Sequence, residues 1–194
     1  MIAGIEAGMV ERVAKASSGG VLPYTLKQVE SYAGQLDDLS QVIRKLPAVW
    51  FAFAGKRRPE RFGGLVWRHF PTFSAFVATR SSRNEAAARH GGPNAPGSYQ
   101  ILMDIRALLV GQDLGLAIDA IAPGPVQNVL QEKGVSIYAH ELTTVYESEG
   151  RPPAGLDDFK HFHADFDLPP HGNVTPPLPA AEADASDDVT METT

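Results

Sequence analysis

The chain has 194 residues, 43% of them hydrophobic, a formal net charge of −6 and no cysteine. This length suits one domain with an appendage, because a core of roughly 150 residues already buries about 70% of its unfolded surface. The absence of cysteine excludes disulfides and thiolate metal sites. The sequence has no apolar run of about 20 residues and no apolar leader, so we expect a soluble protein that is made without export.

The negative charge is concentrated at the C-terminal end. The last basic residue is Lys160, and seven acidic residues follow it. These seven acids contribute −7 to the net charge of −6, so residues 1–160 carry a net charge of +1. A nearly neutral body lacks the strongly basic face of a general nucleic-acid binder. The pattern indicates a mobile acidic arm on a compact body.

The first predicted element is an N-terminal amphipathic helix. Ile2, Ile5, Met9 and Val13 form an apolar stripe at helical spacing, and the sequence SSGG at 17–20 ends it. Such a stripe usually faces the core, so we expect the helix to pack on its own sheet. Binding of a partner by this helix is the alternative.

Two strands and a short helix follow. Residues 22–32 predict a first strand, and Asp37 and Asp38 are candidate N-caps of an amphipathic helix that must end before Pro47. Residues 49–54 are β-branched or aromatic, with alanine between them, which predicts a buried strand at the centre of the sheet.

A basic cluster marks the turn of a long predicted hairpin. The cluster lies in a loop that contains Pro59 and ends at the glycines 63–64. Its members are Lys56, Arg57, Arg58 and Arg61. Residues 65–79 predict the returning strand, with an edge, bulge or bend at Pro71. A solvated turn or a complementary neighbouring subunit explains the charges best, and a phosphate or DNA contact is the alternative.

Residues 80–96 form a segment of unusual length without a clear period. Arg80, Arg83, Arg89 and His90 give it positive charge, and 86–88 is an alanine run that favours a helical turn. Two interpretations are open. The segment is either a surface loop or an arm that orders against an adjacent subunit.

The second half of the domain predicts a helix and a hairpin. Ser98 is the candidate cap of a helix with a broad apolar face that ends at Gly111, and residues 126–130 and 135–146 predict two paired strands. The predicted fold class is therefore α+β. It is a two-layer domain with a mainly antiparallel sheet packed by two helices, and it carries an extended C-terminal arm.

Residues 159–168 alternate between a polar-rich and an apolar row, which predicts a strand added to an exposed sheet edge of the same or a neighbouring subunit. The polar-rich row is Phe159, His161, His163, Asp165 and Asp167. Its histidines and carboxylates permit a divalent metal site as an alternative. Residues 173–194 are rich in proline and acid, and we expect them to be disordered.

Catalytic signatures are missing from the sequence. It contains no phosphate-binding glycine motif, no GxSxG elbow and no paired cysteine and histidine. We therefore expect an assembly component rather than an enzyme, with no cofactor.

Four segments, in this order and spacing, resemble the tail terminator family of Mu-like bacteriophages and prophages. They are ESYAGQLDDL, LPAVWFAFAG, FSAFVATRSSRNEAAARHG and GSYQILMDIRALLVGQDLG. The resemblance covers residues 1–147 and extends to the DLPPHG segment beyond. It implies a tail-terminator-like domain over 1–147. The composition predicts an extended arm over 148–172 and a disordered acidic tail over 173–194, and this tail departs from the family pattern.

The resemblance implies a function by assembly. Proteins of this family form a six-fold ring at the head-proximal end of the tail, stop polymerisation of the tail tube and offer a surface for head joining. Such a ring is a closed heterologous assembly. The implied partners are copies of the chain itself, the tail tube protein, neck or connector proteins, the sheath and DNA passing through the lumen, with no membrane.

The implied location is the virion, after assembly in the cytoplasm of the bacterial host. The two segments 56–61 and 80–96 and the C-terminal arm are the expected contact regions. The candidate interface residues are Lys56, Arg57, Arg58, Arg61, Arg80, Arg83, Arg89, Phe159, His161, His163, Asp165 and Asp167. Another neck or connector protein and a metal-dependent enzyme remain the alternative hypotheses.

Overall fold

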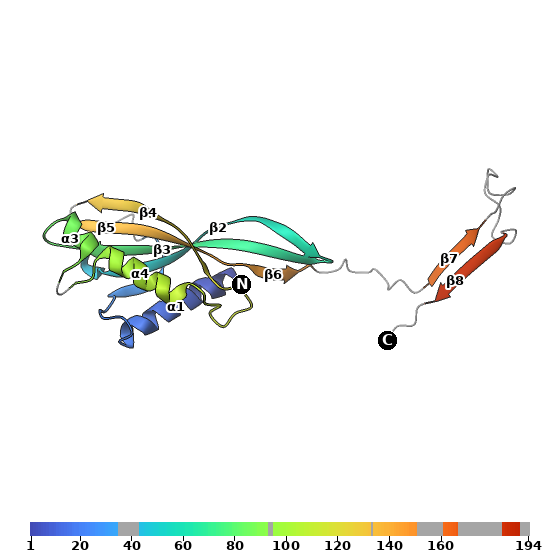
Figure 1. The fold of residues 1–194 in the computed structure, drawn as a ribbon, viewed down its shortest axis with the longest axis horizontal. Coiled ribbons are helices and arrows are strands. Elements are labelled where there is room, and N and C mark those ends of the chain that lie inside the picture. Colours follow the sequence, from blue (N-terminus) through green and yellow to red (C-terminus); the bar gives the residue numbers. More distant parts are fainter. Residues whose placement is uncertain (35–42, 93–94, 133, 151–160, 167–183, 191–194) are drawn as a thin grey trace. The chain divides into compact units, whose positions relative to one another are not determined.

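The computed structural model describes residues 1–34, 43–92, 95–132, 134–150, 161–166 and 184–190 (Figure 1). The chain divides into two compact units, Met1–Gly150 and Arg151–Thr194. In the first unit the elements are α1 (Ile2–Ser18), β1 (Gln28–Ser31), the 3₁₀ turn η2 (Ile43–Lys45), β2 (Ala48–Gly63), β3 (Val66–Arg80), α3 (Glu85–His90), α4 (Ser98–Leu109), β4 (Ala122–Glu132), β5 (Val135–Thr143) and β6 (Tyr146–Glu149). In the second unit they are β7 (His161–Phe166) and β8 (Ala185–Thr190).

The first unit is built on one mainly antiparallel sheet, as predicted. Its strand order is β1-β2-β3-β5-β4, with β6 also paired to β3. Only β1 runs parallel to its neighbour; the other pairs are antiparallel. The central strand is β3 rather than the predicted strand over 49–54, because β3 pairs with β2 along one edge and with both β5 and β6 along the other.

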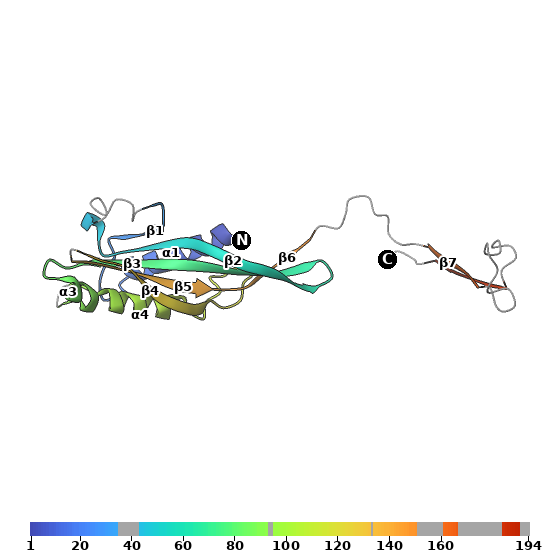
Figure 2. The ribbon, with the colours of Figure 1, turned by 90° about the horizontal axis from the view of Figure 1, so that it is seen from above.

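Two helices cover one face of the sheet, which confirms the two-layer α+β class. The stripe of α1 and the apolar face of α4 pack together on alternate residues of the strands. Figure 2 shows α3 and α4 running along one side of the sheet. The buried residues of this cluster include Ile5, Met9 and Val13 from α1, Ile101, Ile105 and Leu109 from α4, and Val49, Phe51, Phe73, Ala75, Val77 and Leu142 from the sheet.

The opposite face of the sheet carries a smaller apolar cluster near the start of β2. Its buried members are Leu46, Ala48, Trp50, Ala78, Val135 and Ile137. The first four residues of β2 are therefore buried on both faces, which explains why their sequence is a continuous apolar run rather than an alternating one. The partly buried Tyr32 and Ile43 pack against the same cluster.

Pro71 lies where β3 exchanges one partner strand for another. Thr72 pairs with Thr143 of β5, and His69 pairs with Tyr146 of β6. The missing N–H of proline therefore falls in the gap between β5 and β6, where it costs no ladder hydrogen bond. Its carbonyl still accepts a hydrogen bond of 3.3 Å from the backbone N–H of Thr144. The predicted irregularity is confirmed by the register shift between Phe53 and Gly55 on the facing strand.

Several predicted boundaries were wrong. The first strand spans Gln28–Ser31 rather than 22–32. The candidate caps Asp37 and Asp38 lie outside the described residues, and the described part of the predicted short helix is a single 3₁₀ turn. The cap of α4 is Gly97, not Ser98. Ser98 is buried as the first helical residue, with its hydroxyl 3.1 Å from that of Ser136.

The segment 80–96 is ordered by its own domain. Asn84 caps α3, accepting a 2.8 Å hydrogen bond from the N–H of Ala87. The hydroxyl of Thr79 donates to the carbonyl oxygen of the buried Ala88 at 2.8 Å. The predicted helical turn is confirmed as α3, and contact of the segment with an adjacent subunit stays a prediction.

The second unit corrects two predictions about the C-terminal region. The strand within 159–168 pairs with β8 in an antiparallel sheet of two strands, rather than with the edge of the large sheet of its own subunit. Pairing with the sheet of a neighbouring subunit stays a prediction. The partner strand, Ala185–Thr190, lies inside the tail that we expected to be disordered. The sequence did not indicate it because the strand contains two aspartates and no long apolar run.

The contact between the end of α3 and the start of α4 generates a stability prediction. A Cβ built on Gly97 would overlap backbone atoms of 89–91, whereas one built on the nearby Gly92 meets open space. We expect Gly97→Ala to lower the free energy of unfolding by about 3 kcal/mol, because backbone cannot move aside as a side chain can. Gly92→Ala should change it by less than about 0.5 kcal/mol. Urea unfolding of both variants measures this, and equal stabilities would contradict the packing described.

Candidate interaction surfaces

The basic cluster of residues 56–61 lies in a strand, not in a loop as predicted. These residues belong to the outer half of β2, and the turn follows at Gly63 and Gly64, whose φ angles are +150° and +49°. The outer halves of β2 and β3 project past the helices together with β6 (Figure 1). We call residues 54–70 and 146–149 the hairpin arm.

One face of the hairpin arm uses its arginines internally. The guanidinium carbon of Arg57 lies 3.8 Å from the ring centre of Phe70, and that of Arg68 lies 3.4 Å from the ring centre of Phe62. Arg68 also forms an ion pair of 2.9 Å with Glu147 of β6. These contacts hold the three strands of the arm together.

The other face presents an indole and open cations. Trp67 lies directly opposite Arg61 on the neighbouring strand and is 40% exposed. A hollow of about 550 Å³ lies beside them. Its lining residues are Arg57, Arg58, Pro59, Glu60, Arg61 and Trp67. Because Arg57 is held over Phe70, the hollow offers the guanidinium groups of Arg58 and Arg61 beside the indole, which suits a ligand that is both acidic and apolar.

A stacked pair anchors β6 to the same face of the arm. The rings of His69 and Tyr146 lie 4.7 Å apart, and Nε2 of His69 is 2.7 Å from the hydroxyl of Ser148. Partial burial, and then the charge of Lys56, lower the pKa of His69. His69 is therefore neutral at pH 7 and acts in packing rather than as a cation.

The remaining predicted arginines lie at the other end of the sheet. Arg80 ends β3, whereas the tip of the arm adjoins the start of that strand. Arg89, on α3, donates a hydrogen bond of 3.2 Å to the side chain of Gln131. Arg83 precedes α3 in the same connection. The structure therefore separates the two basic clusters that the sequence suggested.

The histidines and aspartates of the C-terminal unit form a network on one face of the β7–β8 hairpin. Asp188 lies 2.9 Å from Nε2 of His161 and 3.1 Å from Nδ1 of His163. Asp165 lies 2.9 Å from Nε2 of His163. The hydrogen bond to Asp188, together with the charges of Asp165 and Asp188, raises the pKa of His163.

A metal site gains no support from the described residues. Within them, no cluster of three or more histidine, cysteine, aspartate or glutamate side chains has a geometry that would hold an ion. The imidazole rings of His161 and His163 pair with the carboxylates of Asp165 and Asp188 instead. Phe159 and Asp167, the other predicted members of that row, lie outside the described residues.

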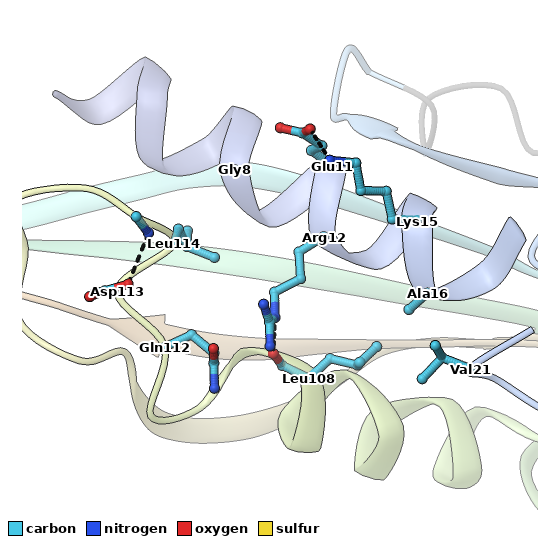
Figure 3. A pocket seen from close by; sticks show the side chains of 11 residues that line it. Gly8, Glu11, Arg12, Lys15, Ala16, Val21, Leu108, Gln112, Asp113 and Leu114 are labelled. Carbon is cyan, nitrogen blue, oxygen red and sulfur yellow. Dashed lines mark hydrogen bonds and ion pairs between the residues drawn. The ribbon is translucent and has the colours of Figure 1, made fainter. Parts of the chain in front are cut away.

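A groove of about 490 Å³ lies between α1 and the end of α4 (Figure 3). It is lined by Gly8, Glu11, Arg12, Lys15, Ala16, Val21, Leu108, Gln112, Asp113, Leu114 and Gly115. Its charged groups act within the domain: Arg12 donates to the carbonyl oxygen of Leu108 at 2.6 Å, and Lys15 pairs with Glu11 at 2.6 Å. The contact with Lys15 lowers the pKa of Glu11. These lining residues hold the helices and contain no pair of nucleophile and base.

Sequence reasoning missed this groove because its two sides are about a hundred positions apart in the chain. One signal was present. Gly8 lies in the middle of a predicted helix, and a glycine at such a position usually has a packing reason. Figure 3 shows Leu114 beside α1 at this point, and a Cβ on Gly8 would lie 3.1 Å from Cδ1 of Leu114. Leu114 itself has a φ of +58°, which is unusual for a residue with a side chain.

The fold and these surfaces define a small α+β domain with a projecting hairpin arm and a separate acidic hairpin. No helix in the described part of the chain is both long and apolar enough to cross a membrane. No curated protein matches the chain.

The family is shown by the match of one family model, Bacteriophage Mu, Gp37, to residues 1–147. The chain belongs to this family. It is therefore a Mu-like phage protein of the structural, tail-related class. The match spans the sheet, the helices and nearly all of the hairpin arm.

The network on β7 and β8 generates a prediction about pH. Because the pKa of His163 is raised in the folded hairpin, its contribution to hairpin stability is complete below the ordinary value of 6.5 and is lost as the pH rises through the raised value. Asp188→Asn should lower the pKa of His163, whereas Asp187→Asn, on the opposite face of the same hairpin, should change it much less. Titration of the imidazole C–H signals by NMR measures both. An unchanged pKa in Asp188→Asn would disprove the contact.

Proposed function

We propose that this protein is the tail terminator of a Mu-like phage. Copies of the chain form a ring, a hexamer by resemblance, that covers the growing end of the tail tube, stops its polymerisation and provides the surface for head joining. The observation that carries the proposal is the family match over residues 1–147, which is the domain that bears the hairpin arm. The order and spacing of the four segments described above support it further.

The design of the sheet edges supports a closed assembly of defined size. The edge strand β4 contains Pro123 and Pro125 and two register shifts, and the outer part of β2 contains Pro59. Prolines and bulges at sheet edges block uncontrolled strand pairing between molecules. Copies would then meet through side chains, and two different faces per subunit close into a ring.

The proposed partners follow from this role. They are further copies of the chain, the tail tube protein, the neck or connector proteins and the sheath, with DNA passing through the lumen without sequence specificity. The location would be the head-proximal end of the tail, after assembly in the host cytoplasm. The protein would act by binding, without catalysis or a cofactor.

The proposal predicts a ring and a length phenotype. The purified full chain should form rings with a central hole in negative-stain micrographs, and native mass spectrometry should give their stoichiometry. A phage that lacks the protein should make tails of uncontrolled length, because nothing caps the growing tube, and the full chain supplied in trans should restore a uniform length.

Two outcomes would contradict this function. A chain that stays monomeric and does not bind tail tubes at any practical concentration would remove the terminator hypothesis. Binding to the portal side of the head, without binding to tube ends, would favour another neck or connector protein.

A further inference from the structure

The hollow on the hairpin arm has an open cationic wall. Arg57 is held over Phe70 and pairs with Glu60 at 3.5 Å. Arg61 donates one hydrogen bond, from Nε to the carbonyl oxygen of Gly64, which leaves its terminal amino groups available. No ion pair involves Arg58 among the described residues. The hollow therefore offers two guanidinium groups beside the exposed ring of Trp67.

The C-terminal hairpin has the complementary chemistry. Strand pairing puts Phe162 opposite Val189, and Phe166 opposite Ala185, on one face. Phe166 is 51% exposed and Val189 is 43% exposed. Asp187 lies on the same face, opposite Ala164. The face is thus apolar with a carboxylate in the middle, and the acids of residues 161–194 are accompanied by no lysine or arginine.

A hairpin of two strands is marginally stable alone in water, so covering its apolar face would stabilise it. We propose that the hollow on the hairpin arm binds the acidic β7–β8 hairpin of a second copy of this chain. Phe166 and Val189 would pack on the indole of Trp67, and Asp187 would pair with Arg58 and Arg61. This inference rests on the proposed function, because it names one subunit contact of the ring.

We choose a second copy as the partner because every copy carries both complementary surfaces and the proposed ring brings copies together. β6 runs outward along the arm, where Glu149 pairs with Val66, and the N–H of Gly150 donates to the carbonyl oxygen of Leu65 at 2.8 Å. The chain therefore leaves the first unit at the tip of the arm.

Nucleic acid fits the arm less well. Carboxylates stand among its cations: Glu60 lines the hollow, and Glu147 and Glu149 lie on β6. These carboxylates would repel a phosphate backbone. A protein surface that binds nucleic acid usually carries a stripe of cations without carboxylates among them. An acidic peptide with apolar side chains can pair with the arginines and keep its own carboxylates away from Glu60.

Disulfide trapping tests the contact in the full chain, which has no cysteine of its own. Glu60→Cys and Ala185→Cys are prepared as separate single variants and mixed under mild oxidation. We expect disulfide-linked pairs of the two variants about tenfold above the control pair of Glu85→Cys with Ala185→Cys, because a contact of about 1.4 kcal/mol changes occupancy tenfold. Glu85 lies on α3, far from the arm in Figure 1.

A charge exchange provides the second measurement. Arg61→Glu in the Glu60→Cys variant should reduce trapping to the control level, and Asp187→Lys in the Ala185→Cys variant should restore part of it. High salt should weaken trapping, because the contact is partly ionic. Neither substitution lies in the buried core, so both variants should fold.

Three results would overturn the inference. The first is trapping at the control level. The second is a double variant, Glu60→Cys/Ala185→Cys, that forms only an internal disulfide. The third is an Arg61→Glu substitution that leaves trapping unchanged but abolishes binding of a random DNA duplex. Native mass spectrometry of the same samples separates the two proposals. Rings without trapping would remove only this contact, whereas the absence of rings in the unmodified chain would remove the proposed function.

Discussion

The double pairing of β3 is the constraint on which the rest of the first unit depends. Its inner half is clamped between β2 and β5, with helices on one face, and its outer half is clamped between β2 and β6. The inner half is stabilised by burial, since Phe73, Ala75 and Val77 are fully covered. That buried half holds the register of the outer half, which has no helices over it. The hairpin arm is therefore a continuous extension of the core sheet.

A second physical theme is the control of unwanted association. The edges of the sheet are β1, β4, β6 and the outer part of β2, and the longer ones, β4 and the outer part of β2, carry proline and bulges. The arginines on one face of the arm are used by aromatic rings and carboxylates of the arm itself. In the described part of the chain, the open surfaces include the hollow beside Trp67, the groove along α1 and the apolar face of the C-terminal hairpin. A protein that must join in a defined geometry benefits from few open surfaces.

Charge organises these open surfaces along the chain. The first unit is almost neutral overall but carries cations on its arm, and the acids are collected after Lys160. Long-range attraction between such regions speeds encounter and selects orientation more than it adds affinity. The aromatic and aliphatic side chains beside the charges would supply the durable part of a contact. The histidine network lies on the opposite face of the β7–β8 hairpin from Asp187, and it gives the stability of that hairpin a dependence on pH.

The sequence by itself determined the α+β class, both long helices, the long hairpin and the strands after Gly124, because these elements follow from periodic burial over many residues. It also located the acidic end. Tertiary structure alone decided that the basic residues 56–61 lie in a strand. Bulges keep these residues paired to β3, and they break the alternation of polar and apolar side chains by which a strand is recognised in a sequence. It alone paired β7 with β8 and separated Arg61 from Arg89. Such contacts join residues distant in the chain, and local propensity carries no information about them.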